Sequence, residues 1–181
     1  MCIRDRDIVE YVRHGIKWKS WIKNFKDYIF LNKQYGDYGI AFDLTITTPG
    51  LFSLKELFDL AVELDVNTLI KTTFAFDSTI MMCPQVLPRV LYNEVLDDII
   101  DYIKPKLIGN EKHSNWIECL EDLKNRPTFQ EQYPNWEEGL KKGKANLHRV
   151  DKWRKNENVL NEIYLKHNKK VYKWWNNKQI I

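Results

Sequence analysis

The sequence predicts an α/β fold in which parallel strands form part of a (β/α) TIM-like barrel, followed by a mainly helical C-terminal extension. Three observations support this prediction. A strand pattern, a helix pattern and a second strand pattern succeed one another between residues 40 and 76. The first strand pattern has one apolar and one polar face. The segment 140–181 is strongly basic and has the spacing of helices.

The first predicted element is an amphipathic helix over residues 17–31. Its apolar positions fall at helical spacing, at Trp18, Trp21, Ile22, Phe25 and Ile29. Gly36 and Gly39 come next within the segment QYGDYG, which favours a turn into the next element.

A strand–helix–strand unit is predicted next. Residues 40–47 alternate strictly between apolar and small or polar side chains, which is typical of a strand. Ser53 and Glu56 have the spacing of a capping box, which would open a helix that runs to Leu64. Residues 68–76 are rich in β-branched and aromatic side chains and form the second strand. This order implies a parallel pair with a right-handed crossover.

The polar face of the first strand favours a barrel. Asp43, Thr45 and Thr47 share that face, whereas a central strand of a doubly wound sheet is apolar on both faces. In a barrel, inward side chains near the carboxyl ends of the strands line a chamber. The alternative is an edge strand with one solvated face.

The rest of the chain is predicted to be helical. Helices are expected over residues 88–104 and from Ser114 to before Pro127, with a loop as far as Pro134. Asn135 and Glu138 give a second capping signal, which opens a basic helical region over 136–175 with a break near 156–158.

The charge of the chain is unevenly distributed. Segment 140–181 holds 12 Lys and Arg against 3 Asp and Glu, whereas residues 1–139 carry a net charge of −6. The basic segment is either a solvated helical face or an arm that binds a polyanion. Its aromatic residues are able to stack on bases or to dock helices. They are Trp153, Tyr164, Tyr172, Trp174 and Trp175.

Composition limits the class of protein. No apolar run is long enough to span a membrane, and a soluble, cytosolic protein without a membrane partner is expected. The three cysteines lack metal-type spacing, and Cys83 is expected to be a buried structural thiol rather than a functional group. The four histidines are expected on the surface.

The order of segments resembles the second half of a radical SAM enzyme with a twitch or SPASM-type extension. The segments that carry the resemblance are residues 10–15 (EYVRHG), the next helix as far as Leu31, residues 42–48 (FDLTITT), 68–76, 83–88 (CPQVLP) and 147–162 (LHRVDKWRKNENVLNE). They resemble the segment after the fourth barrel strand, then the fifth and sixth strands and the terminal helical pattern of that family.

The resemblance implies an enzyme that uses S-adenosylmethionine and a [4Fe–4S] cluster to abstract hydrogen from its substrate. The C-x-x-x-C-x-x-C motif that holds the cluster is absent from this sequence, so these cofactors belong to a longer parent. Residues 1–6 look like translated adaptor sequence at the head of a truncated reading frame. The chain is therefore expected to be an inactive C-terminal fragment, with residues 7–108 as half of a partial barrel and 109–181 as a helical basic extension. Its expected partners are the missing N-terminal half or a second copy.

The resemblance also assigns site residues. Arg13 would meet the carboxylate of S-adenosylmethionine, and Thr45 and Thr47 would lie near its ribose or the substrate. A small-molecule or peptide substrate would be met by the polar positions of the two strands, Asp43, Lys71 and Thr73. The alternative is a non-catalytic nucleic-acid-binding or interaction protein that uses the basic aromatic region 141–178.

Overall fold

The protein is mainly helical. The computed structural model describes residues 6–36, 39–72 and 82–177. The helices are α1 (Arg6–Val12), α2 (Trp18–Tyr35), α3 (Leu54–Leu64), α4 (Arg89–Ile103), α5 (Asn115–Asn125), α6 (Phe129–Gln132), α7 (Trp136–Arg154), α8 (Val159–His167) and α9 (Lys169–Trp175). Within the described residues, none of these helices is both long and apolar enough to cross a membrane.

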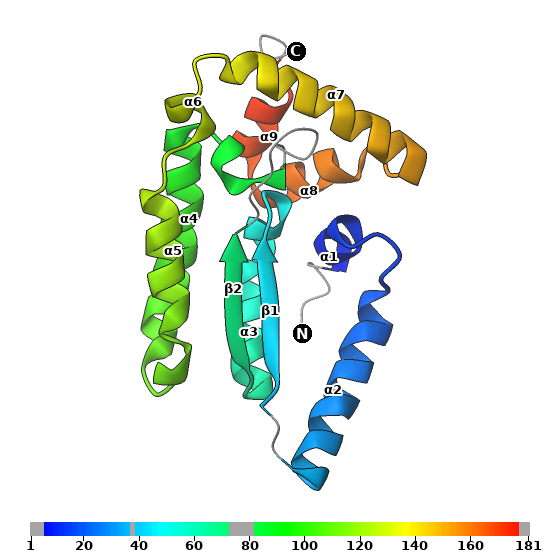
Figure 1. The fold of residues 1–181 in the computed structure, drawn as a ribbon, viewed down its shortest axis with the longest axis vertical. Coiled ribbons are helices and arrows are strands. Elements are labelled where there is room, and N and C mark those ends of the chain that lie inside the picture. The colour runs from blue at the N-terminus through cyan, green and yellow to red at the C-terminus, as the bar shows by residue number, and fades with distance from the viewer. Residues whose placement is uncertain (1–5, 37–38, 73–81, 178–181) are drawn as a thin grey trace.

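The predicted strand–helix–strand unit is confirmed. Strands β1 (Ala41–Ile46) and β2 (Asn67–Thr72) are parallel, with Ala41 opposite Asn67 and Ile46 opposite Thr72. Helix α3 makes the crossover between them and lies behind the sheet in Figure 1. Residues 73–76, the rest of the predicted second strand, lie outside the described residues.

The prediction of a partial barrel is wrong. In the described part of the chain the sheet has only two strands, β1 and β2. Helices α1 and α2 lie on the outer side of β1, while α4 and α5 lie beyond β2 (Figure 1). At the outer edge of β2, the side-chain amide of Asn115 in α5 donates to the carbonyl of Thr68 at 2.7 Å. Within the part of the chain that the structure describes, helices rather than further strands therefore flank the sheet.

Strand β1 matches the alternative of an edge strand with one solvated face. Phe42 and Ile46 are buried, while Asp43 and Thr45 are exposed. A polar strand face has the same sequence pattern whether it lines a barrel or meets water, because both environments accept polar side chains. The predicted strand is therefore confirmed, but the barrel inferred from it is wrong.

Two hydrophobic cores hold the elements together. The smaller core lies between α2, β1 and α3, where Phe25 stacks on Phe42 with ring centroids 4.8 Å apart and on Trp21 at 5.2 Å. The larger core draws on α1, α3, α4, α5, α7, α8 and α9. Trp116 and Tyr164 are among its fully buried members.

The capping predictions fail at two helices. Ser53 makes no capping bond, because a 3-10 turn precedes α3 and the Ser53 hydroxyl donates to the carbonyl of Gly50 at 2.9 Å. Asn135 makes no side-chain cap either. The capping box is instead formed by Thr128 and Glu131 at the start of α6, within the segment predicted to be a loop.

The basic region is helical and broken as predicted. α7 ends at Arg154, and α8 begins at Val159. A second break lies at Asn168, whose side-chain oxygen accepts from the backbone amides of Lys170 and Val171, each at 3.0 Å. That contact caps α9, since Asn is a favoured N-cap residue.

The prediction for His113 is wrong, because its side chain is fully buried. It lies edge-on to Phe58, with ring centroids 6.0 Å apart. Neither ring nitrogen has a hydrogen-bond partner among the described residues. Cys83 is buried as predicted.

Candidate functional site

A groove of about 300 Å³ lies beside β1. It is bounded by α1, the first turn of α2, β1 and the turn into α3. Four of the six residues predicted for a ligand site line it, namely Arg13, Asp43, Thr45 and Thr47. Lys71 is paired with one of them, and Thr73 lies outside the described residues.

Arg13 comes directly after α1 and is exposed. The backbone turns there because Gly15 adopts a positive φ of 92°, which glycine accepts without strain. The backbone amide of Trp18 donates to the Glu10 carboxylate at 3.0 Å and fixes the start of α2 relative to α1. The Arg13 guanidinium makes no hydrogen bond or ion pair with another described residue, so its donors are open to a ligand.

The two threonines of β1 and the turn after it have different surroundings. Thr45 is exposed, and its hydroxyl makes no hydrogen bond within the described part of the chain. Thr47 is buried, and its Oγ1 accepts from the amide of Gly50 at 3.1 Å. Thr47 thus stabilises the turn after the strand, while Thr45 offers a free hydroxyl.

Asp43 and Lys71 neutralise each other on the exposed face of the sheet. Lys71 Nζ lies 2.8 Å from Asp43 Oδ2, and both side chains are more than half exposed. The strand register sets Lys71 opposite Thr45, so the ion pair is a diagonal contact across β1 and β2.

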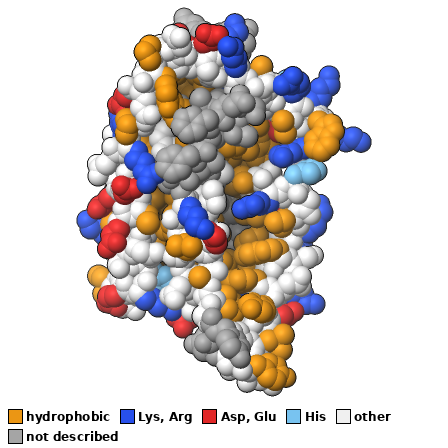
Figure 2. Space-filling model, viewed as in Figure 1, with side chains coloured by type: hydrophobic (Ala, Val, Ile, Leu, Met, Phe, Trp, Pro, Cys, Tyr) orange, Lys and Arg blue, Asp and Glu red, His pale blue; other side chains and the backbone are white. Residues whose placement is uncertain are grey.

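The apolar wall of the groove includes two tryptophans that sequence reasoning placed only on the buried face of a helix. Trp18 and Trp21 both line the groove, and their rings stack with centroids 5.2 Å apart. Figure 2 shows hydrophobic side chains gathered between the sheet and α2. The three-residue spacing of two tryptophans shortly after Arg13 was the signal available in the sequence.

The described cysteines do not fit an iron–sulfur cluster. Cys83 is buried and its thiol contacts the side-chain oxygen of Gln85 at 2.7 Å. Cys119 lies on α5, where burial raises the pKa of its thiol. Among the described residues there is no group of three or more Cys, His, Asp or Glu that would hold a metal ion.

The arrangement can bind an anion at one end and an apolar group along its wall. Guanidinium pairs with carboxylate in a planar, two-bond geometry, and indole rings cover flat apolar surfaces. Comparisons of this chain with protein-family models, curated proteins and solved structures find no match.

Proposed function

We propose that the groove binds a small molecule that carries a carboxylate and a flat or apolar part. The observation that carries the proposal is the exposed guanidinium of Arg13, unpaired among the described residues, at the side of a groove walled by Trp18 and Trp21. A charge-assisted bond to a carboxylate would anchor one end of the ligand, and the tryptophans would cover the other.

The resemblance to radical SAM enzymes makes S-adenosylmethionine the first ligand to test. Its amino-acid part has the carboxylate that suits Arg13, and its ribose has hydroxyls that suit Thr45. Thr47 also lines the groove, but it is buried and its Oγ1 already accepts from the Gly50 amide, so Thr45 is the more accessible of the two hydroxyls. Asp43 and Lys71 remain available to a polar small-molecule or peptide substrate on the exposed sheet face.

The proposal is limited to ligand binding. The described residues do not supply cluster ligands, so no radical step is assigned to them. In this proposal the chain is the ligand-binding part of a radical SAM enzyme whose cluster cysteines lie elsewhere. We also propose a cytosolic location, because three cysteines without paired spacing do not indicate a disulfide framework.

The test compares S-adenosylhomocysteine with 5′-methylthioadenosine by calorimetry. The two share the adenosine and the thioether, but only the first has the carboxylate. We expect S-adenosylhomocysteine to bind about tenfold or more tightly, because a hydrogen bond to a charged group is worth roughly 1.5–3 kcal/mol. Arg13→Gln should abolish that difference.

Lys23→Gln is the matched control, because Lys23 is also an exposed cation but does not line the groove. It should leave both affinities unchanged. Equal binding of the two compounds, or an Arg13→Gln protein that still discriminates between them, overturns the proposal.

A further inference from the structure

The structure divides the aromatic residues of the basic region into docked and exposed ones. Tyr164 is buried, and Trp175 meets it edge-on with ring centroids 5.6 Å apart. Trp174 and Tyr172 are partly buried and pack against the larger core. Trp153, in contrast, is 80% exposed. Within the described chain, one of the five aromatic side chains considered for base stacking is therefore free to do so.

Trp153 lies on the solvent-facing side of α7. The opposite side is buried, at Leu140, Gly143, Leu147 and Asp151. Arg149 precedes Trp153 by four residues, so both side chains lie on one face of the helix. Lys152 lies next to it on the same exposed side.

No described acid forms an ion pair with the cations around Trp153. Arg149, Lys152 and Lys155 are exposed, and none forms an ion pair with a described residue. The Arg149 guanidinium donates to the side-chain oxygen of Asn146, a neutral group. Asp151, the acid within this stretch of α7, is buried against Tyr11.

From this arrangement we infer that the exposed face of α7 binds single-stranded nucleic acid. A base stacks on the indole of Trp153, and the phosphates on either side contact Arg149, Lys152 and Lys155. The combination distinguishes this partner: cations alone would suit any polyanion, whereas a flat exposed ring among cations suits an anion that carries flat bases. The inference is independent of the groove beside β1.

The test measures binding of a fluorescently labelled 12-nucleotide oligothymidylate to the full chain by anisotropy, at several salt concentrations. Trp153→Ala should weaken binding by about tenfold, because it removes the aromatic ring on which a base stacks. Its salt dependence should stay that of the unmodified protein. Trp153→Phe, which keeps an aromatic ring, should restore most of the affinity.

Charge removal should have the complementary effect. Affinity falls as salt rises, so the slope of log affinity against log salt is negative. In the triple variant R149Q/K152Q/K155Q this slope should be shallower by about 2, because each phosphate contact on a single strand contributes about 0.7. The matched control is K19Q/K23Q/K33Q, which removes the same charge from exposed positions of α2. It should change the slope far less. All these side chains are exposed, so thermal melts of the variants should match the unmodified protein.

Three results would overturn the inference. One is no binding at 50 mM salt. Another is equal affinity of Trp153→Ala and the unmodified protein. The third is binding of polyglutamate as tight as that of the oligonucleotide, which would assign this face to an acidic protein partner instead.

Discussion

The hydroxyl of Tyr11 in α1 donates to both carboxylate oxygens of Asp151 in α7, at 3.1 and 3.0 Å. The residues are 140 positions apart, and both are buried. Arg13 comes directly after α1 and Trp153 lies on α7, so this contact joins the elements that carry the two proposed binding sites. Burial raises the pKa of Asp151, while the hydrogen bond from Tyr11 acts in the opposite direction.

The raised pKa of Asp151 predicts a characteristic pH dependence of folding. The ionised carboxylate is less favourable in the folded chain than in the unfolded chain, whose aspartates keep the ordinary value of about 3.8. Relative to Asp151→Asn, the unmodified protein should therefore gain stability as the pH falls from 7 towards 4. Urea unfolding at pH 7 and pH 4.5 measures this difference. If the unmodified protein instead loses stability relative to Asp151→Asn at the lower pH, the raised pKa of Asp151 is contradicted.

Tyr11→Phe removes the donor and leaves the carboxylate of Asp151 buried without its tyrosine partner. We expect it to destabilise the fold by about 1–3 kcal/mol at pH 7, measured by urea unfolding. Combined with Asp151→Asn, the same change should cost less, because no buried charge is left unpaired.

We expect the side chain of Thr47, and not the backbone angles of Gly50, to exclude a larger residue at position 50. A Cβ at this position would lie 2.7 Å from Oγ1 of Thr47, which already accepts the Gly50 amide. Gly50→Ala should cost about 1–3 kcal/mol, as overpacking does in well-packed sites. In a Thr47→Ala background the clash is gone, and the same substitution should cost little. A penalty of equal size in both backgrounds would place the constraint elsewhere.

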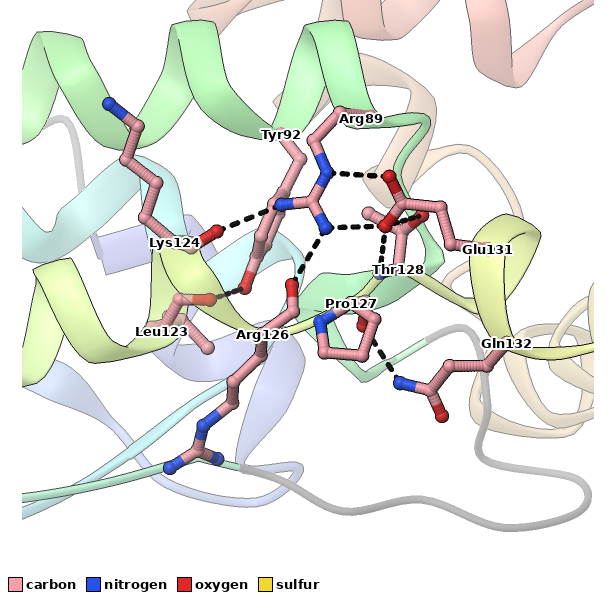
Figure 3. A network of polar contacts seen from close by, with 9 residues as sticks. All are labelled: Arg89, Tyr92, Leu123, Lys124, Arg126, Pro127, Thr128, Glu131 and Gln132. Carbon is pink, nitrogen blue, oxygen red and sulfur yellow. Dashed lines mark hydrogen bonds and ion pairs between the residues drawn. The ribbon is translucent and has the colours of Figure 1, made fainter.

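The guanidinium of Arg89 joins α4, α5 and α6 (Figure 3). It donates to the carbonyls of Lys124 and Arg126, at 2.8 and 2.9 Å, and binds the carboxylate of Glu131. An ammonium does not reproduce this planar set of bonds, so Arg89→Lys should lower the free energy of unfolding by roughly 1–3 kcal/mol. Chemical denaturation at pH 7 measures the change.

The same contact makes the fold sensitive to acid. The Arg89 guanidinium, with a smaller contribution from the amide of Thr128, lowers the pKa of Glu131 from its ordinary 4.5 to about 2. A depressed carboxyl pKa adds stability above 4.5 that is lost as the pH falls towards 2. Arg89→Gln should therefore flatten the stability profile between pH 4.5 and 2. If the two proteins lose stability in parallel between pH 4.5 and 2, the pKa of Glu131 does not depend on Arg89.

His113 is predicted to weaken the fold in mild acid. Burial lowers the pKa of its imidazole below the ordinary 6.5, so protons bind more tightly to the unfolded chain and stability falls as the pH drops through 6.5. His113→Leu should be within about 1 kcal/mol of the unmodified protein at pH 8, since no hydrogen bond to a described residue is lost. At pH 5 it should be the more stable protein. Thermal melts at both pH values test this expectation.

Part of the candidate site is predictable from local sequence patterns. The alternation in residues 40–47 fixes which side chains share a face, and it places Asp43 and Thr45 together on the exposed side of β1. Arg13 precedes the first predicted helix, where its spacing alone favours an ordinary surface charge, so its anion-binding role came only from the family resemblance. The hydrogen bond between Thr47 and Gly50, by contrast, depends on the 3-10 turn that precedes α3. The sequence did not predict this turn, because the pattern at Ser53 indicated a capping box there instead.

Local patterns along the chain specify the strand–helix–strand unit, its parallel direction and the break in the basic helical region, because these depend on periodicity and on short connections. Packing between distant elements settles the rest: helices flank the two strands, His113 is buried, and Trp153 stays exposed while Tyr164 and Trp175 dock. Burial depends on which distant element packs against a side chain, and neighbouring residues in the sequence do not specify that element.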